Sequence, residues 1–183
     1  DVIATCPWGR FYEDPREAEA QIDYPLFKTM KPVDWLVQAW TDHLMMHGAT
    51  WLIPRKVLDR SGLWDESTSL INDHEFFCRV MLACREIVFV PGTRTYYRSA
   101  VEGNLSGQRS RKALESAFFA LTESSKNLLS VDDSPRTRRA CATKMQRFVY
   151  EYYPQAPDLI ASAEALVREY GGADVEPHVG GRG

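Results

Sequence analysis

Strand-forming stretches in this chain are few, short and confined to its first 107 residues. The clearest runs from Glu86 to Val90, where β-branched residues and a phenylalanine precede Pro91-Gly92. Weaker candidates occupy residues 1–6, 49–53 and 95–98. Three or four short strands are too few for a closed α/β sheet, so the pattern predicts only part of a larger mixed sheet.

Helical periodicity dominates the rest of the chain. Between the first strand and the first helix, the sequence predicts a loop over 7–12 and a helical turn over 13–20. Apolar spacing predicts helices over 32–40, 54–59, 72–85, 109–130, 135–152 and 156–170. The predicted organisation is an α/β segment over 1–107, a helical extension over 108–171 and a disordered tail over 172–183.

The composition is that of an ordinary globular protein and argues against two classes of partner. Hydrophobic residues make up 44% of the chain, charged residues 26%, and the formal net charge is -3. This charge does not suit a general nucleic-acid binder, and no apolar run approaches the roughly 20 residues that span a bilayer. Four cysteines without a C-x-x-C pair predict buried free thiols, a cytoplasmic location and no zinc site.

The segment Asn72-Asp73-His74-Glu75 is the strongest candidate for chemistry. It opens an amphipathic helix, whose positive N-terminal dipole stabilises an acid in the first turn. One interpretation is structural: Asn72 and Glu75 form a capping-box variant, and Asp73 adds a charge worth about 0.3–1 kcal/mol. The other is catalytic, with Asp73 as a general base beside a closing loop. Spacing alone favours the cap.

Five motifs follow one another over residues 49–107. They are Trp51-Leu52-Ile53-Pro54-Arg55, Gly62-Leu63-Trp64-Asp65-Glu66, Asn72-Asp73 with Arg79, Ile87-Val88-Phe89-Val90-Pro91, and Tyr96-Tyr97-Arg98 with Asn104-Leu105-Ser106. In this order and spacing they resemble the C-terminal half of a family-2 glycosyltransferase with the GT-A fold. The match is clear over about a third of the chain and weaker over residues 1–48.

The resemblance implies a fold and a reaction. Residues 1–107 would form the acceptor-side, C-terminal part of a GT-A (Rossmann-like) mixed sheet, followed by an α-helical appendage. The reaction would be an inverting transfer of a sugar from a nucleotide sugar to a hydroxyl of a saccharide, lipid-linked or protein acceptor. Asp73 would be the general base that accepts the proton of that hydroxyl.

The resemblance also implies a donor site built from arginines. Arg98 ends a strand, and Arg109 and Arg111 follow the polar loop after it. Cationic forks at these positions would bind the donor diphosphate and stabilise the charge that develops on it. The loop over 99–111 would close on the donor as a lid. The alternative for all three arginines is a solvated surface role.

An acceptor site is implied beside the same base. It would use Trp64, Asp65 and Glu66 from the turn before the helix, and His47 and Gly48 from the approach to the strand at 49–53. Aromatic faces pack on sugar C–H groups, and carboxylates bind sugar hydroxyls. Trp64 as a core residue is an equal alternative. His43 and His47 are four residues apart, but two histidines without a third ligand are a weak metal signal.

Two departures from the family limit what this chain can do by itself. The family's Glu-Asp pair is Asn72-Asp73 here, and the nucleotide-binding half with its Asp-x-Asp metal motif is absent. Asp132-Asp133 follows no strand and does not replace that motif. We therefore expect further residues before Asp1, a divalent cation (Mg²⁺ or Mn²⁺) only in the complete enzyme, and little activity from this chain alone.

A basic helix face suggests a different function. It consists of Arg136, Arg138, Arg139, Lys144 and Arg147. Such a face is usually solvated, but it can also meet an acidic partner, a phosphorylated carrier or a membrane surface, which would make the protein peripheral. The alternative is thus a non-enzymatic helical protein-interaction module on an α/β scaffold. Its partner would be the missing half or another copy of the chain.

The two hypotheses predict different surfaces. The glycosyltransferase predicts that Asp73 and Arg98 converge on one cleft. The interaction module predicts a large exposed apolar face on the helices over 109–170 and no cleft at Asp73.

Overall fold

Two small sheets form the strand part of the molecule. The first has the order β4 (Trp51–Leu52), β1 (Val2–Thr5), β5 (Glu86–Phe89), and the second has the order β3 (Glu19–Ala20), β2 (Trp8–Phe11), β6 (Thr95–Arg98). In each sheet the middle strand is antiparallel to the first neighbour and parallel to the second. The structure, a computed structural model that describes residues 1–20, 23–100 and 107–176, is therefore of the mixed α/β class that the sequence predicts.

The two sheets are built from successive stretches of the same chain segments. β1 leads into β2, and β5 leads into β6. Val2 lies opposite Glu86 and Trp8 lies opposite Thr95, so the second segment carries extra residues between the two pairs. The parallel pairing is interrupted at that point and then resumes. The predicted loop over 7–12 is wrong, because β2 is fixed by pairing with a distant strand that its own residues do not reveal.

Helices in the described residues agree closely with the predicted ranges. They are α1 (Pro32–Thr41), α2 (Arg55–Ser61), α3 (Asn72–Leu82), α4 (Arg111–Val131), α5 (Pro135–Tyr152) and α6 (Pro157–Glu169). Two short 3₁₀ helices are added at Pro15–Glu17 and Gly48–Thr50. The predicted helical turn over 13–20 is thus a 3₁₀ turn followed by β3. None of the described helices has the length and apolarity needed to cross a bilayer.

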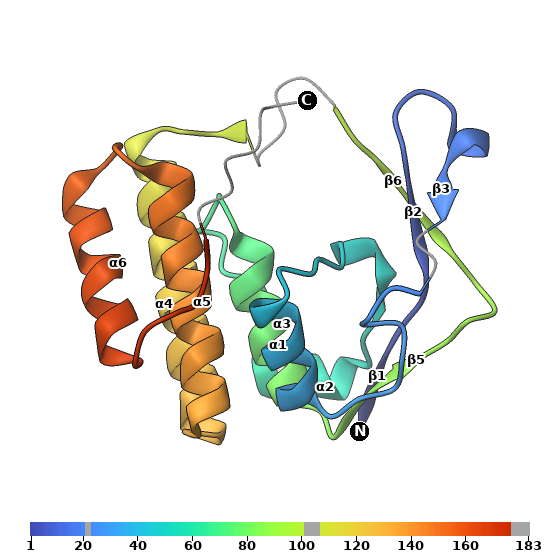
Figure 1. Cartoon of the computed structure of the whole chain (residues 1–183). Coiled ribbons are helices and arrows are strands. Elements are labelled where there is room, and N and C mark those ends of the chain that lie inside the picture. The colour runs from blue at the N-terminus through green and yellow to red at the C-terminus, as the bar shows by residue number, and fades with distance from the viewer. Residues whose placement is uncertain (21–22, 101–106, 177–183) are drawn as a thin grey trace.

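A single hydrophobic core joins the α/β segment to the helical extension. In Figure 1 the strands lie at one side, α4, α5 and α6 lie at the other, and α1, α2 and α3 lie between them. Helix α3 packs against α4, and α1 packs against α5. Ile3 and Ile87 of the first sheet and Leu128 and Met145 of the extension are all 0% exposed. The helices of the extension therefore pack on α1 and α3 and share one core with them.

The chain returns to α5 after its last helix. Arg139 of α5 pairs with Asp174, and the Tyr150 hydroxyl donates to the Val175 carbonyl over 3.0 Å. Residues 172–176 of the predicted disordered tail are consequently held against α5. The remainder of that prediction, 177–183, lies outside the described residues.

Candidate functional site

The start of α3 lies on the side of the molecule where α/β proteins usually bind ligands. β1 and β5 run parallel, and their carboxyl ends point to the same side as the N-terminus of α3 (Figure 1). Ligands of open α/β sheets bind beyond the carboxyl ends of the strands. Asp73, in the first turn of α3, is therefore placed on the expected side.

The first turn of α3 differs from the predicted capping box. Its N-cap is Ile71, which adopts the left-handed conformation (φ 61°, ψ 22°) and makes no side-chain cap bond. A β-branched residue is rarely found there, and such strain is common at functional sites. Asn72 is already helical, and Glu75 turns to Arg79, so the capping prediction is wrong. The predicted pairing of Asn72 with Glu75 is therefore not what holds Asp73 at the helix start.

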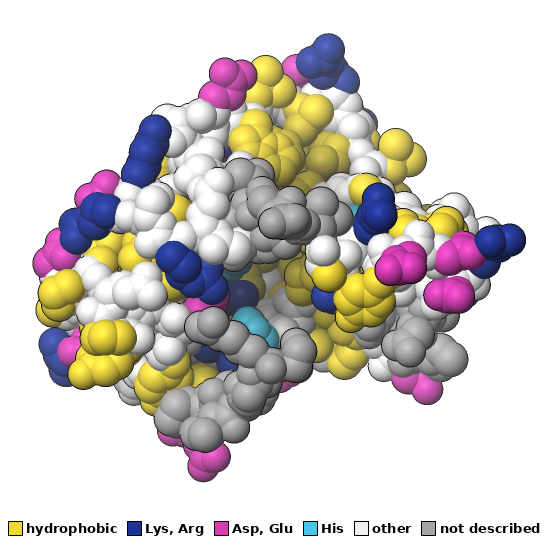
Figure 2. Space-filling view, turned by 90° about the horizontal axis from the view of Figure 1, so that it is seen from above, with side chains coloured by type: hydrophobic (Ala, Val, Ile, Leu, Met, Phe, Trp, Pro, Cys, Tyr) yellow, Lys and Arg dark blue, Asp and Glu magenta, His cyan; other side chains and the backbone are white. Residues whose placement is uncertain are grey.

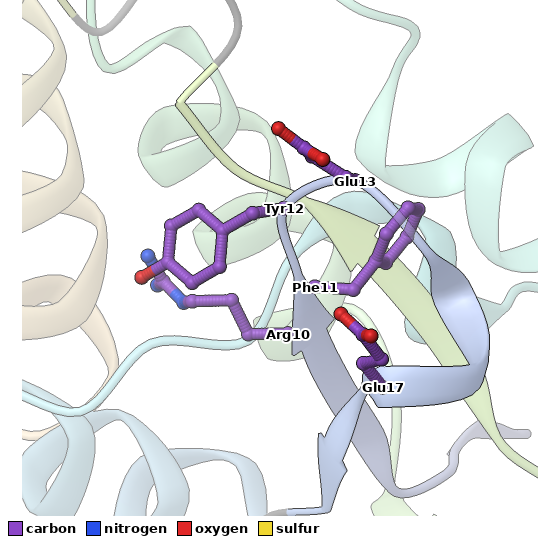
Figure 3. Close-up of a pocket in the computed structure, with 5 residues that line it drawn as sticks. All are labelled: Arg10, Phe11, Tyr12, Glu13 and Glu17. Carbon is purple, nitrogen blue, oxygen red and sulfur yellow. The ribbon is translucent and has the colours of Figure 1, made fainter.

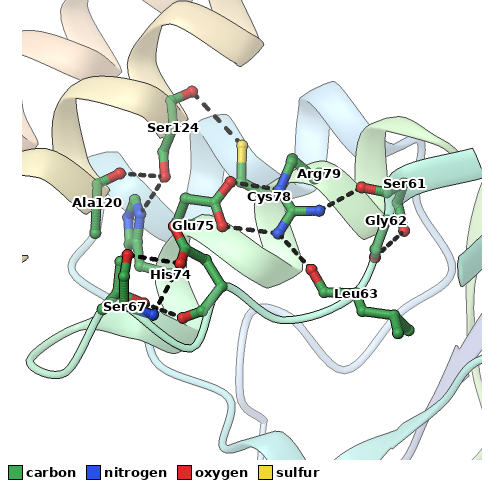
Figure 4. Close-up of polar contacts among 12 residues, drawn as sticks. Ser61, Gly62, Leu63, Ser67, His74, Glu75, Cys78, Arg79, Ala120 and Ser124 are labelled. Atoms are coloured by element: carbon green, nitrogen blue, oxygen red, sulfur yellow. Dashed lines mark hydrogen bonds and ion pairs between the residues drawn. The ribbon is translucent and has the colours of Figure 1, made fainter.

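Arg79 ties the preceding turn to α3. It forms an ion pair with Glu75, with Nη2 donating to Oε2 over 2.9 Å, and its guanidinium also donates to the carbonyls of Ser61 and Leu63 (Figure 4). Glu75 is only 7% exposed. The hydrogen bond to Glu75 is the main reason that the pKa of Arg79 is raised. Arg79 thus pairs with an acid of its own helix, and the pair fixes the direction from which the chain enters α3.

Asp73 lines a pocket of about 310 Å³ between α1, α3 and α5. Its walls are mainly aromatic and aliphatic, and its polar residues are Asp73, His74, His43 and Lys144. Figure 2 looks down on the face where α3 begins, and it shows histidine and basic side chains inside a central hollow. A concave apolar site with a few convergent polar groups is the usual form of a small-molecule site.

The pocket alters the acid–base properties of two residues. Desolvation raises the pKa of Asp73, although the residue is exposed at the pocket mouth, because the surrounding protein weakens its hydration. Hydrogen bonds from backbone N–H groups at the helix start and the charge of Lys144 act in the opposite direction. Burial also lowers the pKa of Lys144 to about 8, with help from Arg147. Perturbed groups that face each other in a pocket are typical of functional sites.

His74 is a pocket residue that is absent from the predicted site residues. Its ring stacks on Trp40 at 4.8 Å and is largely enclosed. Ser124 donates to the carbonyl of Ala120 over 2.7 Å, so its oxygen accepts from Nδ1 of His74 over 2.9 Å (Figure 4). Burial holds the pKa of His74 well below its usual value. The imidazole is therefore neutral, and Nε2 is left as an acceptor with no partner in the described part of the chain.

A sequence signal for His74 did exist. His74, Phe77, Cys78 and Met81 fall at i, i+3, i+4 and i+7 of α3, and all four line the pocket. A histidine at the N-terminal end of an apolar stripe is expected to face the core.

Phe77 lines the Asp73 pocket, whereas the predicted acceptor residues Trp64, Gly48 and Asp65 do not. Trp64 stacks on Phe76 at 4.3 Å, outside the pocket, and is 38% exposed. A Cβ added at Gly48 would lie 3.6 Å from the Phe77 ring, an ordinary contact distance, so Gly48 lies beside Phe77 with room for a small side chain. Asp65 caps its own turn by accepting from the amide and hydroxyl of Ser67 at 2.9 and 2.7 Å.

The remaining acceptor candidates also lie away from the pocket. Glu66 is exposed in the turn after Asp65. His47 is buried between Trp8 and Tyr97, with ring centroids 5.4 and 5.2 Å away, and its Nε2 contacts the Thr95 hydroxyl at 3.1 Å. Burial lowers the pKa of His47. These contacts are those of a core histidine that supports the second sheet.

The predicted donor arginines are placed against different elements. Arg98 Nε donates to the carbonyl of Tyr12 over 3.2 Å, and Arg98 is not among the residues that line the Asp73 pocket. Arg111 forms a two-pronged bond with Asp158, at 2.6 and 2.7 Å, and also binds Glu115. Both of its hydrogen-bonding edges are thus used within the extension.

Arg109 is the donor candidate that comes nearest to the Asp73 side. Its guanidinium lies 5.2 Å from the Tyr152 ring and contacts Glu151 at 3.4 Å. Tyr152 and Glu151 line a smaller cavity of about 70 Å³ together with His74 and Lys144. The polar loop at 101–106, including Asn104-Leu105-Ser106, lies outside the described residues.

A second hollow of about 300 Å³ lies beside the second sheet. It is lined by Arg10, Phe11, Tyr12, Glu13 and Glu17, and Figure 3 shows Arg10 and Tyr12 pointing to one side of β2 while Phe11 points to the other. The Arg10 guanidinium also lies 5.7 Å from the Tyr97 ring. The hollow combines one base with two acids at the end of β2, the middle strand of the second sheet, and its lining contains none of the predicted site residues.

The basic helix face is largely neutralised by nearby acids. Arg136 bonds Asp34 at 2.5 Å, Arg138 bonds Asp133 at 2.7 Å, and Arg139 pairs with Asp174. Lys144 faces the Asp73 pocket instead. The large apolar side chains exposed on described parts of α4 and α5 are Phe119, Val131 and Tyr150, spread along the two helices.

Comparison with known proteins adds no assignment. No protein-family model, curated protein or solved structure matches the chain. Over residues 1–20, 23–100 and 107–176, no group of three His, Cys, Asp or Glu side chains could hold a metal ion.

Proposed function

We propose that this chain supplies the acceptor side of an inverting glycosyltransferase of the GT-A type, with Asp73 as the general base. The observation that carries the proposal is the position of Asp73 in the first turn of α3, at the mouth of an aromatic pocket. Desolvation there raises the pKa of the carboxyl and so makes it a stronger base. The five family-like motifs of the sequence support the same assignment.

The proposed reaction is a single displacement. The acceptor oxygen forms a bond to the anomeric carbon, the bond to the nucleoside diphosphate breaks with its electron pair, and the hydroxyl proton passes to Asp73. Lys144 lines the same pocket, and its charge favours the carboxylate form of Asp73 before the transfer. The aromatic walls exclude water, which strengthens the interactions of the charged groups.

The donor and its cation are assigned to the complete enzyme. Mg²⁺ or Mn²⁺ would be held there by the family's Asp-x-Asp motif, which this sequence does not contain, and would stabilise the leaving diphosphate. Of the three predicted donor arginines, Arg109 is the one beside the smaller cavity, through its contact with Tyr152, and we assign it to the leaving diphosphate.

The test is Asp73→Asn in the complete enzyme that contains this chain. Loss of a general base is expected to lower kcat by about 10²–10⁴-fold, measured as nucleoside diphosphate release, while the circular dichroism spectrum stays unchanged. Asp59→Asn, at an exposed acid of α2, is the matched control and should keep full activity. Activity retained by Asp73→Asn would remove Asp73 from the role of base.

A further inference from the structure

The walls of the Asp73 pocket are more apolar than the binding of a sugar hydroxyl requires. Trp35 and Trp40 of α1 and Met81 of α3 are 5%, 3% and 2% exposed, and Phe77 completes the same surface. Burial of apolar surface contributes about 25 cal/mol per Å². The apolar lining of the pocket therefore favours a ligand with a hydrocarbon body.

The pocket is large enough for more than one ring. A cavity of about 150 Å³ lined by apolar side chains binds benzene in another protein. The Asp73 pocket holds about 310 Å³, so a bicyclic or branched hydrocarbon group can enter it.

Charges around the pocket are balanced. Asp73 faces Lys144, and Glu151 faces Arg147 at the adjoining smaller cavity. His43, His74, Cys78 and Tyr152 complete the titratable groups on these walls. His74 is neutral, and burial raises the pKa of the Cys78 thiol and of the Tyr152 hydroxyl, so both stay uncharged. A carboxylate or ammonium ligand would upset this balance in a poorly hydrated space, whereas an uncharged ligand would not.

Three buried polar atoms belong to pocket residues and have no hydrogen-bond partner within the described chain. They are Nε1 of Trp35, Nε1 of Trp51 and Nε2 of His74. Two are donors and one is an acceptor, which suits a ligand that carries oxygen rather than a pure hydrocarbon.

We propose that the acceptor bound in this pocket is an uncharged alcohol with a bulky apolar body, whose hydroxyl lies between Asp73 and Lys144. The hydroxyl donates to the carboxylate and accepts from the ammonium group, and the hydrocarbon body packs on the tryptophans. The inference rests on the proposed function for its reaction, but binding of the alcohol requires no donor.

The test uses three probes of different chemistry on the chain of residues 1–183. Adamantanemethanol is the bulky neutral alcohol, adamantanecarboxylate is its charged counterpart, and glycerol is a polar polyol. Binding is measured by calorimetry and by fluorescence of the wall tryptophans. The alcohol is expected to bind saturably, with the carboxylate at least about tenfold weaker, equivalent to 1.4 kcal/mol, and with no saturable binding of glycerol.

Two variants block the pocket in different ways. Ala39→Phe fills it from α1, and Met45→Phe, at a residue that is 39% exposed, narrows its mouth without altering the core. Each should weaken alcohol binding at least about tenfold, while Val131→Phe, at an exposed position of α4, should leave it unchanged. If Ala39→Phe does not fold, Met45→Phe still decides the outcome.

Asp73→Asn tests the charge balance directly. Removing the acid leaves Lys144 unopposed, so this variant should lose preference for the alcohol and gain affinity for the carboxylate. Wild-type binding of the carboxylate or glycerol as tight as that of the alcohol, no binding of the alcohol, or binding unaffected by Met45→Phe would overturn the inference. Saturable alcohol binding by this chain, combined with full activity of Asp73→Asn in the complete enzyme, would instead overturn only the proposed function.

Discussion

His74 shows how strongly one residue depends on the helical extension. Its tautomer is set by Ser124 of α4, and its ring is covered by Trp40 of α1. Neither neighbour is close to His74 in sequence. A local pattern can place this histidine on the inner face of α3, but its protonation state follows only from packing.

The buried imidazole predicts a specific loss of stability in acid. The unfolded chain binds a proton at His74 near pH 6.5, whereas the folded chain binds it only well below that pH. Between these two values the unfolded state holds more protons, so the free energy of unfolding falls as the pH falls. Urea unfolding at pH 7.5 and 5.5 should show a smaller fall for His74→Gln than for wild type. Equal falls in both proteins would contradict the assignment.

Asp73 has the opposite dependence on pH. Its folded pKa lies above 3.8, so the folded state binds the proton more tightly and loses stability as the pH rises through the raised pKa. Asp73→Asn should therefore melt at a higher temperature than wild type at pH 7, and the gap should close below pH 3.8. Calorimetric melting curves at both pH values check this, with Asp59→Asn as the control. A lower melting temperature for Asp73→Asn at pH 7 would show that the carboxylate stabilises the fold.

At the scale of elements, the connection between α2 and α3 depends on one glycine. Gly62 ends α2 with φ 79°, and a side chain there would also meet Nη1 of Arg79 at 3.2 Å. Gly62→Ala is expected to cost about 1–3 kcal/mol of unfolding free energy, because only glycine readily adopts φ 79° together with ψ 168°. Gly92→Ala is the matched control, since nothing lies within 4 Å of the position of its added carbon. Equal stability of the two variants in urea would argue against the strain.

Elements fixed by local pattern were predicted well, and those fixed by distant partners were not. The helices follow from apolar spacing and from the prolines that open α1, α5 and α6. β2 was missed because its strand character comes from pairing with β6. The cap of α3 was wrong because the Glu75 side chain is held by Arg79 rather than by the helix start.

For the whole molecule, the shared core predicts that both segments unfold together. All five tryptophans lie within the first 64 residues, whereas α4, α5 and α6 supply most of the helical signal. Tryptophan fluorescence and far-ultraviolet circular dichroism should therefore give the same urea midpoint. Leu128→Ala, at a 0% exposed residue of α4, should lower stability by about 2–5 kcal/mol and shift both midpoints equally. A shift in circular dichroism alone would show two independent units.

The candidate site was only partly accessible to sequence reasoning for the same reason. Asp73 could be selected because its motif neighbours are close in the chain. Lys144 could not, because it reaches the pocket from α5 through the packing of α1 on α5. Arg98 was expected beside Asp73, yet its contact is with Tyr12. The expected boundary near residue 107 and the sugar-transfer activity remain predictions.

The buried cysteines allow local opening of the structure to be measured at four positions. Cys6, Cys78, Cys84 and Cys141 are all free and buried, and burial raises the pKa of Cys141 to about 12. A thiolate-selective alkylating reagent can reach each sulfur only when its surroundings open. The labelling rate at each of the four positions, separated by mass spectrometry, would therefore show how readily the first sheet, α3 and α5 open relative to one another. The measurement needs no mutation.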